Sequence, residues 1–197
     1  MSLSPLLAVV ASLLGQAAPA RHSPEQAWLE GARAQLGVPY TFGGRRRRGD
    51  GIDCLGVVLA GAERATGCGW RSFPVDPTAL VNAKVLGVPV EGLAPIKSSA
   101  LDLTQLRPGD VIMLVAPDEN PKEGPIGTLD GRPVWVWHMG LYAGDGRWIV
   151  GDHFAGQVVE VPLAPYLAEH ADTYTGVFIT RPPGPLPQPC RKHAPLK

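Results

Sequence analysis

The sequence predicts an α+β fold, in which helices from the first third of the chain pack on a small antiparallel β-sheet. Two observations carry this prediction. Apolar residues recur at helical spacing in two capped segments before residue 68, whereas short β-type runs separated by turns dominate after residue 110. At 197 residues, with 45% hydrophobic and 18% charged residues, the chain can form one compact domain with its own core, or two at most.

The formal net charge is zero, from 18 basic and 18 acidic residues, which argues against a nucleic-acid partner. An apolar run over 6–14 precedes the small-x-small ending Ala18-Pro19-Ala20, so we expect a signal peptide over 1–20 and an exported protein, periplasmic or extracellular. A buried N-terminal helix is the alternative, because no Lys or Arg precedes the run. The run is too short to span a bilayer, so we expect no stable membrane insertion of the mature chain.

The first helix is predicted to begin after Ser23, because a Ser cap, a Pro at the first helical position and a Gln three residues after the cap form a helix-start signal. Apolar residues then recur at helical spacing up to Leu36, and Gly37 ends the segment. An extended stretch over 38–42 leads to a basic run, Arg45 to Arg48. Such a run is usually a solvated loop, although beside a cleft it could attract carboxylate-rich or phosphate-rich polymers.

The second helix is expected to begin after Asp53, a good N-cap, and to stop at Gly67. Cys54 falls in its first turn, where unpaired backbone N–H groups and the helix dipole favour an anion, so we expect a lowered thiol pKa there. The chain has three cysteines, an odd number that leaves at least one thiol unpaired. Whether Cys68 and Cys190 pair with each other, or are both reduced, is left open by the sequence.

The rest of the chain alternates long loops with short strands. We expect a Pro-rich excursion over 70–106, a loop over 116–132 and a Pro-rich flexible tail over 184–197, so that the domain itself spans 21–183. The remaining elements are predicted as a short helix from Asp76 to about Val85, strands over 111–115, 134–143, 147–151, 158–161 and 176–180, and a helix over 163–170.

His138 is the natural partner for Cys54, because a cysteine nucleophile needs a base within reach. Alternation along the strand 134–143 places His138 on the face opposite Trp135 and Trp137, and the Trp-rich face is the expected core. Gly140 lies on the same face as the histidine and leaves room for another element to approach. Taken singly, such a cysteine is more often a small core residue, and such a histidine a structural one.

The order of these segments resembles that of the NlpC/P60 cysteine peptidases. The matching pieces are Gly37-Val38-Pro39-Tyr40 with Gly43-Gly44, Asp53-Cys54-Leu55-Gly56, Arg107-Pro108-Gly109-Asp110-Val111, and His138-Met139-Gly140-Leu141-Tyr142 before Gly144-Asp145-Gly146. The resemblance covers about residues 24–181. It implies a papain-like α+β fold with the nucleophile at the N-terminus of a helix. The Cys-Leu-Gly form looks closest to the phage-associated branch of the family.

Members of this family typically hydrolyse peptide bonds in bacterial cell-wall stem peptides, often beside D-glutamate. Carried over by position, Cys54 would be the nucleophile and His138 the base, Tyr40 would line the site, and Asp53 would contact the free amine of the substrate. The implied partner is a peptidoglycan peptide, with a phage-tail-like or secretion assembly open as a second partner. Neither a metal nor an organic cofactor is implied.

Two departures from the family pattern matter. Leu55 follows the nucleophile where many members have a Ser that holds the substrate. The position of the third catalytic group falls on Val150, which cannot orient a histidine, so either Asp152 or His153 is predicted to serve, with the carboxylate favoured. The same Cys–His pair would also suit a papain-like acyltransferase, deamidase or toxin effector, and Val150 keeps open a catalytically silent wall-binding domain.

Overall fold

The computed structural model describes residues 23–45 and 51–182. Four of the features expected above lie outside these ranges: the signal peptide over 1–20, Arg46 to Arg48, Cys190 and the tail over 184–197. The predictions about them, including any pairing of Cys190, therefore stay predictions.

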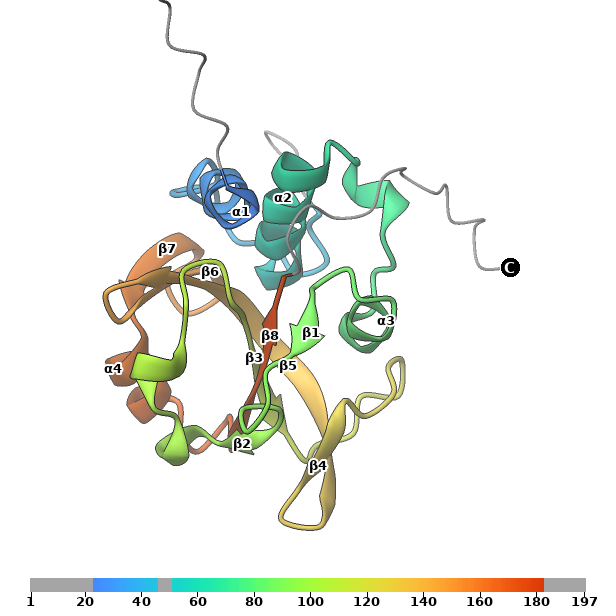
Figure 1. The fold of residues 1–197 in the computed structure, drawn as a ribbon, viewed down its shortest axis with the longest axis vertical. Coiled ribbons are helices and arrows are strands. Elements are labelled where there is room, and N and C mark those ends of the chain that lie inside the picture. The colour runs from blue at the N-terminus through green and yellow to red at the C-terminus, as the bar shows by residue number, and fades with distance from the viewer. Residues whose placement is uncertain (1–22, 46–50, 183–197) are drawn as a thin grey trace, which may run out of the picture.

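The two N-terminal helices form where their capping residues predict. Helix α1 (Pro24–Arg33) begins with a complete capping box on Ser23, and α2 (Cys54–Thr66) runs from the Asp53 cap to a left-handed Gly67. They lie side by side above the sheet (Figure 1). Helix α1 ends earlier than expected, so Leu36 is 44% exposed and the prediction that the helix extends to it is wrong.

The sheet confirms the predicted α+β class. Its strands are β1 (Val88–Pro89), β2 (Ile96–Lys97), β3 (Val111–Ala116), β4 (Gly127–Leu129), β5 (Arg132–Gly144), β6 (Arg147–Asp152), β7 (Gln157–Pro162) and β8 (Gly176–Arg181). Every pairing is antiparallel, in the order β1-β8-β3-β5-β6-β7, with β2 also paired to β8 and β4 to β5. The sheet curls strongly, and α4 (Leu163–Glu169) lies beside β7 (Figure 1).

The predicted loops hold more structure than the sequence indicated. Residues 70–106 contain α3 (Pro77–Asn82), which is shorter than predicted, and three 3-10 turns, η1 (Trp70–Ser72), η2 (Ser98–Ala100) and η3 (Leu103–Gln105). The expected loop over 116–132 is wrong at its end, where β4 and β5 form a hairpin. Asp130 and Gly131 have φ of 50° and 77°, the geometry of the two-residue turn that favours Asp-Gly.

Apolar side chains cover both faces of the sheet. One face packs on α1 and α2, where Trp28, Leu59 and Leu141 are fully buried. The other face packs on α4 and on the segment after β1, around Trp148 and Ile179. Since the sheet is covered on both sides, residues on either face of a central strand are removed from water, and His138 is among them.

A β-bulge in β5 changes which residues face α2. Leu114 pairs with His138 but Val115 pairs with Val136, so Trp137 has no partner across the sheet. Val136 consequently joins Met139 on the α2 face, and Trp137 is 45% exposed. The prediction that Trp137 belongs to the core is therefore wrong, because strict alternation does not survive a bulge.

Gly151 in β6 allows the sheet to approach the start of α2. A Cβ atom there would lie 2.9 Å from the backbone carbon and oxygen of Asp53 and 3.1 Å from the nitrogen of Cys54. The glycine that admits α2 is thus Gly151. Gly140, which was expected to leave that room, instead faces the ring of Trp148, 2.8 Å from its Cβ position.

The turn before β3 is closed by a buried ion pair. Asp110 is 1% exposed, accepts a hydrogen bond from the backbone N–H of Arg107, and receives two more from the Arg181 guanidinium at 2.7 and 2.8 Å. Arg181 ends β8, so this pair ties the start of β3 to the end of its neighbour. It thereby stabilises the pairing of β8 with β3, the strand that pairs on its other edge with β5.

Candidate active site

Cys54 and His138 line one cleft of about 450 Å³. Its walls come from the first turn of α2, the bulged part of β5, the loop over 42–45, the start of α3, and residues 120–123. The two side chains that the sequence singled out as nucleophile and base thus line the same cleft, one from a helix N-terminus and one from a strand. Three apolar side chains on the rim are conspicuously exposed: Phe42 at 90%, Val75 at 52% and Trp137 at 45%.

The Cys54 thiol is free and half-buried at the first position of α2. Burial raises its pKa, while the backbone N–H groups of Met139, Leu55 and Cys54 itself, and the Arg45 guanidinium, act in the opposite direction. The net direction is upward, contrary to the lowered pKa that the helix start predicted. Desolvation between α2 and β5 outweighs the backbone N–H groups and Arg45, so the thiol depends on a base to lose its proton.

His138 is held as the neutral imidazole, the form that can accept a proton. It is 2% exposed, and burial, together with the charges of His153 and His170, lowers its pKa to about 3. Its ring stacks nearly parallel to those of Tyr174 and Tyr166, with interplanar angles of 12° and 21°. The Nε2 atom is buried and has no hydrogen-bond partner among the described residues. A neutral imidazole accepts a proton, as a base for Cys54 must.

Asp152 lies at the end of β6, near this cluster, without contacting the histidine by a hydrogen bond. Its carboxylate accepts from the backbone N–H of Phe154 at 2.9 Å and from the Tyr166 hydroxyl at 3.5 Å. Tyr166 in turn stacks on His138. Asp152 therefore reaches the base only through Tyr166 in this arrangement.

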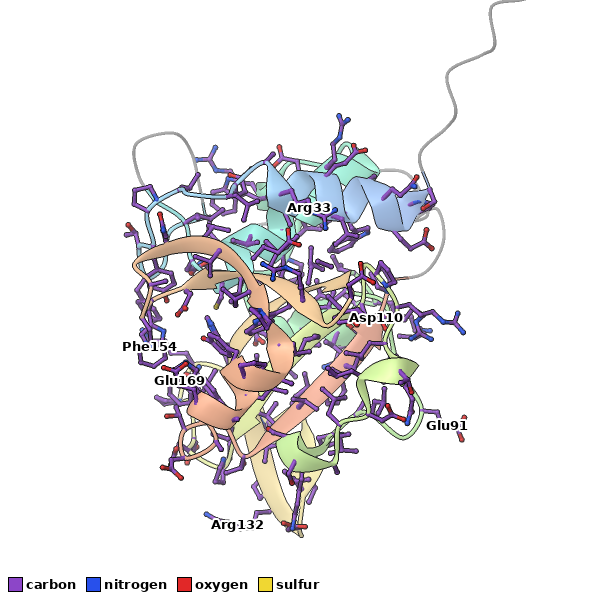
Figure 2. The ribbon with its side chains drawn as sticks, turned by 90° about the vertical axis from the view of Figure 1, so that its left-hand side faces the viewer. Arg33, Glu91, Asp110, Arg132, Phe154 and Glu169 are labelled. Carbon is purple, nitrogen blue, oxygen red and sulfur yellow. The ribbon has the colours of Figure 1, made fainter. Side chains whose placement is uncertain are left out.

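His153 and Tyr40 form the remaining side of the cluster. The His153 ring lies 5.9 Å from that of His138 and 6.0 Å from that of Tyr40. It also packs at 3.7 Å on Phe154, which lies beside the end of α4 near Glu169 (Figure 2). Burial raises the pKa of Tyr40 to about 12, helped by the nearby Cys54 and Tyr174. Tyr40, Asp152 and His153 thus gather around His138, but none of these three lines the cleft that holds Cys54.

The fold gives the clearest link to known proteins. NlpC2 from Trichomonas vaginalis superimposes with a TM-score of 0.52 and 20% identity, over 81% of this chain and 46% of that one. The chain has the NlpC/P60 fold. An NlpC/P60 family protein from Bacillus cereus superimposes with a TM-score of 0.49 and 22% identity, and the match covers 80% of this chain and 40% of the Bacillus cereus chain. A P60 domain from a Mycobacterium avium subspecies paratuberculosis antigen superimposes with a TM-score of 0.49 and 21% identity, and the match covers 80% of this chain and 93% of that domain's chain.

The assignment of the NlpC/P60 fold rests on the first of these structures. The chain spans less than half the length of NlpC2 and of the Bacillus cereus protein. No protein-family model matches the sequence, and no curated protein does so either. The likeness is one of fold alone.

Within this NlpC/P60 fold, Asp53 is fully engaged as a structural group. It is 4% exposed, accepts from the backbone N–H groups of Gly56 at 2.7 Å and Gly43 at 3.2 Å, and forms an ion pair with Arg45. The predicted contact of Asp53 with a substrate amine would have to compete with these three donors. Leu55, the residue directly after Cys54, lines the cleft and is 4% exposed.

Two charged residues of the cleft were not predicted as site residues. Arg45 was noted only as part of the basic run, and Glu123 was not singled out. The basic run drew attention to the loop, but no signal marks Arg45 as the partner of Asp53 eight residues on. Glu123 lies in a segment that was expected to be a plain loop. Its pKa is raised to about 7 by burial and by the charge of Asp76.

Within residues 23–45 and 51–182, no group of three or more His, Cys, Asp or Glu side chains could hold a metal ion. None of the helices in this part of the chain is both long and apolar enough to cross a membrane.

Proposed function

We propose that this chain belongs to the NlpC/P60 family and is a cysteine peptidase or amidase that hydrolyses peptide bonds of bacterial cell-wall stem peptides. The observation that carries the proposal is the meeting of Cys54, at the start of a helix, and neutral His138 in one cleft. The NlpC/P60 fold and the four ordered motifs support the same reading. Action on peptidoglycan fits export, which stays a prediction.

The chemistry follows from the two protonation states. His138 takes the Cys54 proton as the sulfur attacks the substrate carbonyl, and the developing oxyanion can be bound by the Cys54 backbone N–H. The imidazolium then returns the proton to the leaving amine as the C–N bond breaks. Water, deprotonated by the same histidine, hydrolyses the thioester and regenerates the thiol. Because burial opposes charge on both groups, proton transfer and attack are expected to be coupled.

The test is digestion of purified peptidoglycan by the full chain, with released fragments identified by mass spectrometry. Cleaved stem peptides should be released by the wild type and should be absent with Cys54→Ala and with His138→Gln. Product release is preferred to thiol alkylation as a readout, since the raised thiol pKa makes a slow reaction with iodoacetamide at pH 7 uninformative. Release that persists in Cys54→Ala would refute the proposal.

A further inference from the structure

Two charged side chains of the cleft wall, Arg45 and Glu123, take no part in the chemistry proposed for Cys54 and His138. Both are half-buried, with the Arg45 side chain 18% exposed. Each has a buried polar atom, Nε of Arg45 and Oε2 of Glu123, without a hydrogen-bond partner in the described part of the chain. An unpartnered buried polar atom is costly, so a ligand that supplies partners to these groups binds favourably.

Asp53 holds Arg45 in the wall without using up its donors. The Asp53 carboxylate pairs with the Nη1 atom of Arg45 and is itself fixed by the backbone N–H groups of Gly43 and Gly56. A guanidinium presents five N–H donors in a planar fork, and this pair engages one nitrogen only. Arg45 therefore has donors for a second carboxylate.

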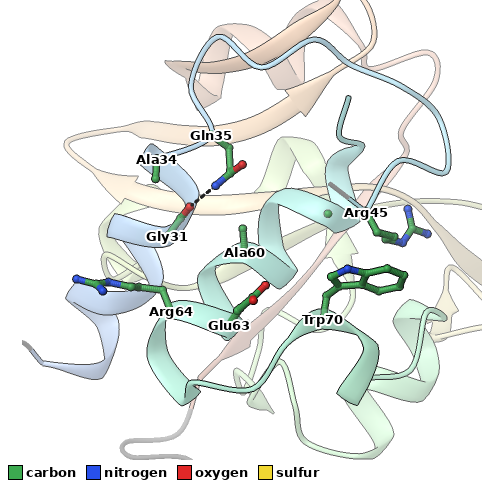
Figure 3. A pocket seen from close by; sticks show the side chains of 9 residues that line it. Gly31, Ala34, Gln35, Arg45, Ala60, Glu63, Arg64 and Trp70 are labelled. Atoms are coloured by element: carbon green, nitrogen blue, oxygen red, sulfur yellow. Dashed lines mark hydrogen bonds between the residues drawn. The ribbon is translucent and has the colours of Figure 1, made fainter. Parts of the chain in front are cut away.

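Arg45 lies between the cleft and a smaller cavity. That cavity, of about 270 Å³, is also lined by Trp70 and Glu63. Arg45 and Trp70 occupy one end of it and Arg64 the other (Figure 3). Arg45 thus borders open space on two sides, and the protein core does not enclose it.

Two indoles of β5 hold the loop that carries Glu123 at the cleft. Trp135 Nε1 donates to the backbone oxygen of Glu123 at 3.1 Å, and Trp137 Nε1 donates to that of Asp118 at 3.0 Å. Arg45 interacts electrostatically with Glu123, and each charge favours the ionised form of the other. The cleft wall thus combines a permanent cation with an acid whose charge depends on pH.

We propose that Arg45 determines specificity by binding a carboxylate of the substrate next to the scissile bond. The inference rests on the proposed function and names its substrate class: stem peptides whose glutamate carboxylate is free, in preference to those in which it is a carboxamide. A carboxamide at that place offers Arg45 one neutral acceptor in place of a charged, bidentate one.

Glu123 makes this recognition depend on pH. Burial and the charge of Asp76 raise the pKa of Glu123, whereas Arg45 and a hydrogen bond from Asn120 lower it, and the resulting pKa is about 7. Below pH 7 the protonated acid leaves Arg45 to the substrate; above it, the ionised acid repels the substrate carboxylate and competes for the guanidinium. Lys122, a second cation lining the cleft among the described residues, is exposed, so water screens its charge. The preference for a carboxylate should therefore fall as pH rises through 7.

The experiment compares two synthetic stem peptides that differ only in a free or amidated glutamate α-carboxyl group. The ratio of their kcat/KM values is measured at pH 6 and pH 8, since a ratio does not depend on the fraction of folded enzyme. The wild type should prefer the carboxylate by roughly tenfold or more at pH 6. Arg45→Gln should bring the ratio close to one, whereas Lys122→Gln, a matched loss of one cation from the same cleft, should keep it within about twofold.

Glu123→Gln should keep the preference at both pH values. Equal cleavage of both peptides by the wild type, or a preference that survives Arg45→Gln, overturns the inference and leaves the proposed function standing. Cleavage of neither peptide overturns the proposed function and the inference with it. If Arg45→Gln does not fold, the wild-type ratio and its loss at pH 8, compared with Glu123→Gln, decide the question.

Discussion

Replacing Gly151 with Ala should push Cys54 out of place without changing the thiol or its proposed partner His138. The added Cβ would lie 2.9 Å from backbone atoms of Asp53, where a comfortable contact begins at about 3.4 Å. The obstacle is backbone on both sides, so no side chain can rotate away. Either β6 or the first turn of α2 must move by about half an ångström.

The expected cost has two parts. Forcing one methyl group into a packed interface typically costs about 1–3 kcal/mol of stability. Since a displacement of about 1 Å at a reacting group can cost about a hundredfold in rate, a shift of half that size should reduce hydrolysis roughly tenfold. Both effects arise at the junction of Gly151 with Cys54, so they should be seen in the same variant.

The assay pairs urea denaturation with the rate of stem-peptide release. Gly69→Ala is the matched control, because Gly69 has ordinary extended backbone angles and its added Cβ would meet only a side-chain oxygen of Glu63 at 3.9 Å. The control should change stability by less than about 0.5 kcal/mol and leave the rate intact. If Gly151→Ala matches Gly69→Ala in both measurements, the reasoning from close approach is refuted.

Three further predictions test other parts of the molecule. His138 is protonated near pH 6.5 in the unfolded chain but only near pH 3 in the folded protein. The free energy of unfolding should therefore be at its full value above pH 6.5 and should fall by roughly 3 kcal/mol between pH 7 and pH 4. In His138→Gln, denaturation midpoints should lose this dependence on pH. Asp110→Ala should cost roughly 2–3 kcal/mol in urea denaturation, because it leaves Arg181 partly buried and unpaired, and a loss below 0.5 kcal/mol would contradict this. Asp152→Asn should lower the hydrolysis rate at least tenfold and His153→Gln much less, since the buried Asp152 carboxylate accepts a hydrogen bond from Tyr166, whose ring stacks on His138. The opposite order would make His153 the third catalytic group.

The parts of the fold that could be predicted were those with local signals. Ser23, Asp53 and Gly67 satisfy backbone groups at helix ends, and they do so whatever the rest of the chain does. The order of helix, turn and strand that carries Cys54 and His138 followed from such signals and from the resemblance to a known family. The hairpin between β4 and β5 also had a local signal, Asp130-Gly131, which was passed over.

What could not be predicted depends on long-range packing. The bulge at Trp137 is visible only in how β5 pairs with β3, because alternation along one strand contains no trace of it. Likewise, the upward shift of the Cys54 pKa comes from burial between α2 and β5, which a helix-start signal does not report. The pairing of Arg45 with Asp53 and the position of Glu123 arise from loops that meet only in the folded chain.

The bulge in β5 also provides an optical probe. It turns the Trp137 indole outward beside the cleft, while Trp28 and Trp148 are fully shielded in the two cores. Acrylamide in solution can therefore quench Trp137 but has no access to those two. A ligand that fills the cleft covers the same indole, so its binding can be followed in the unlabelled protein by the change in tryptophan emission and quenching.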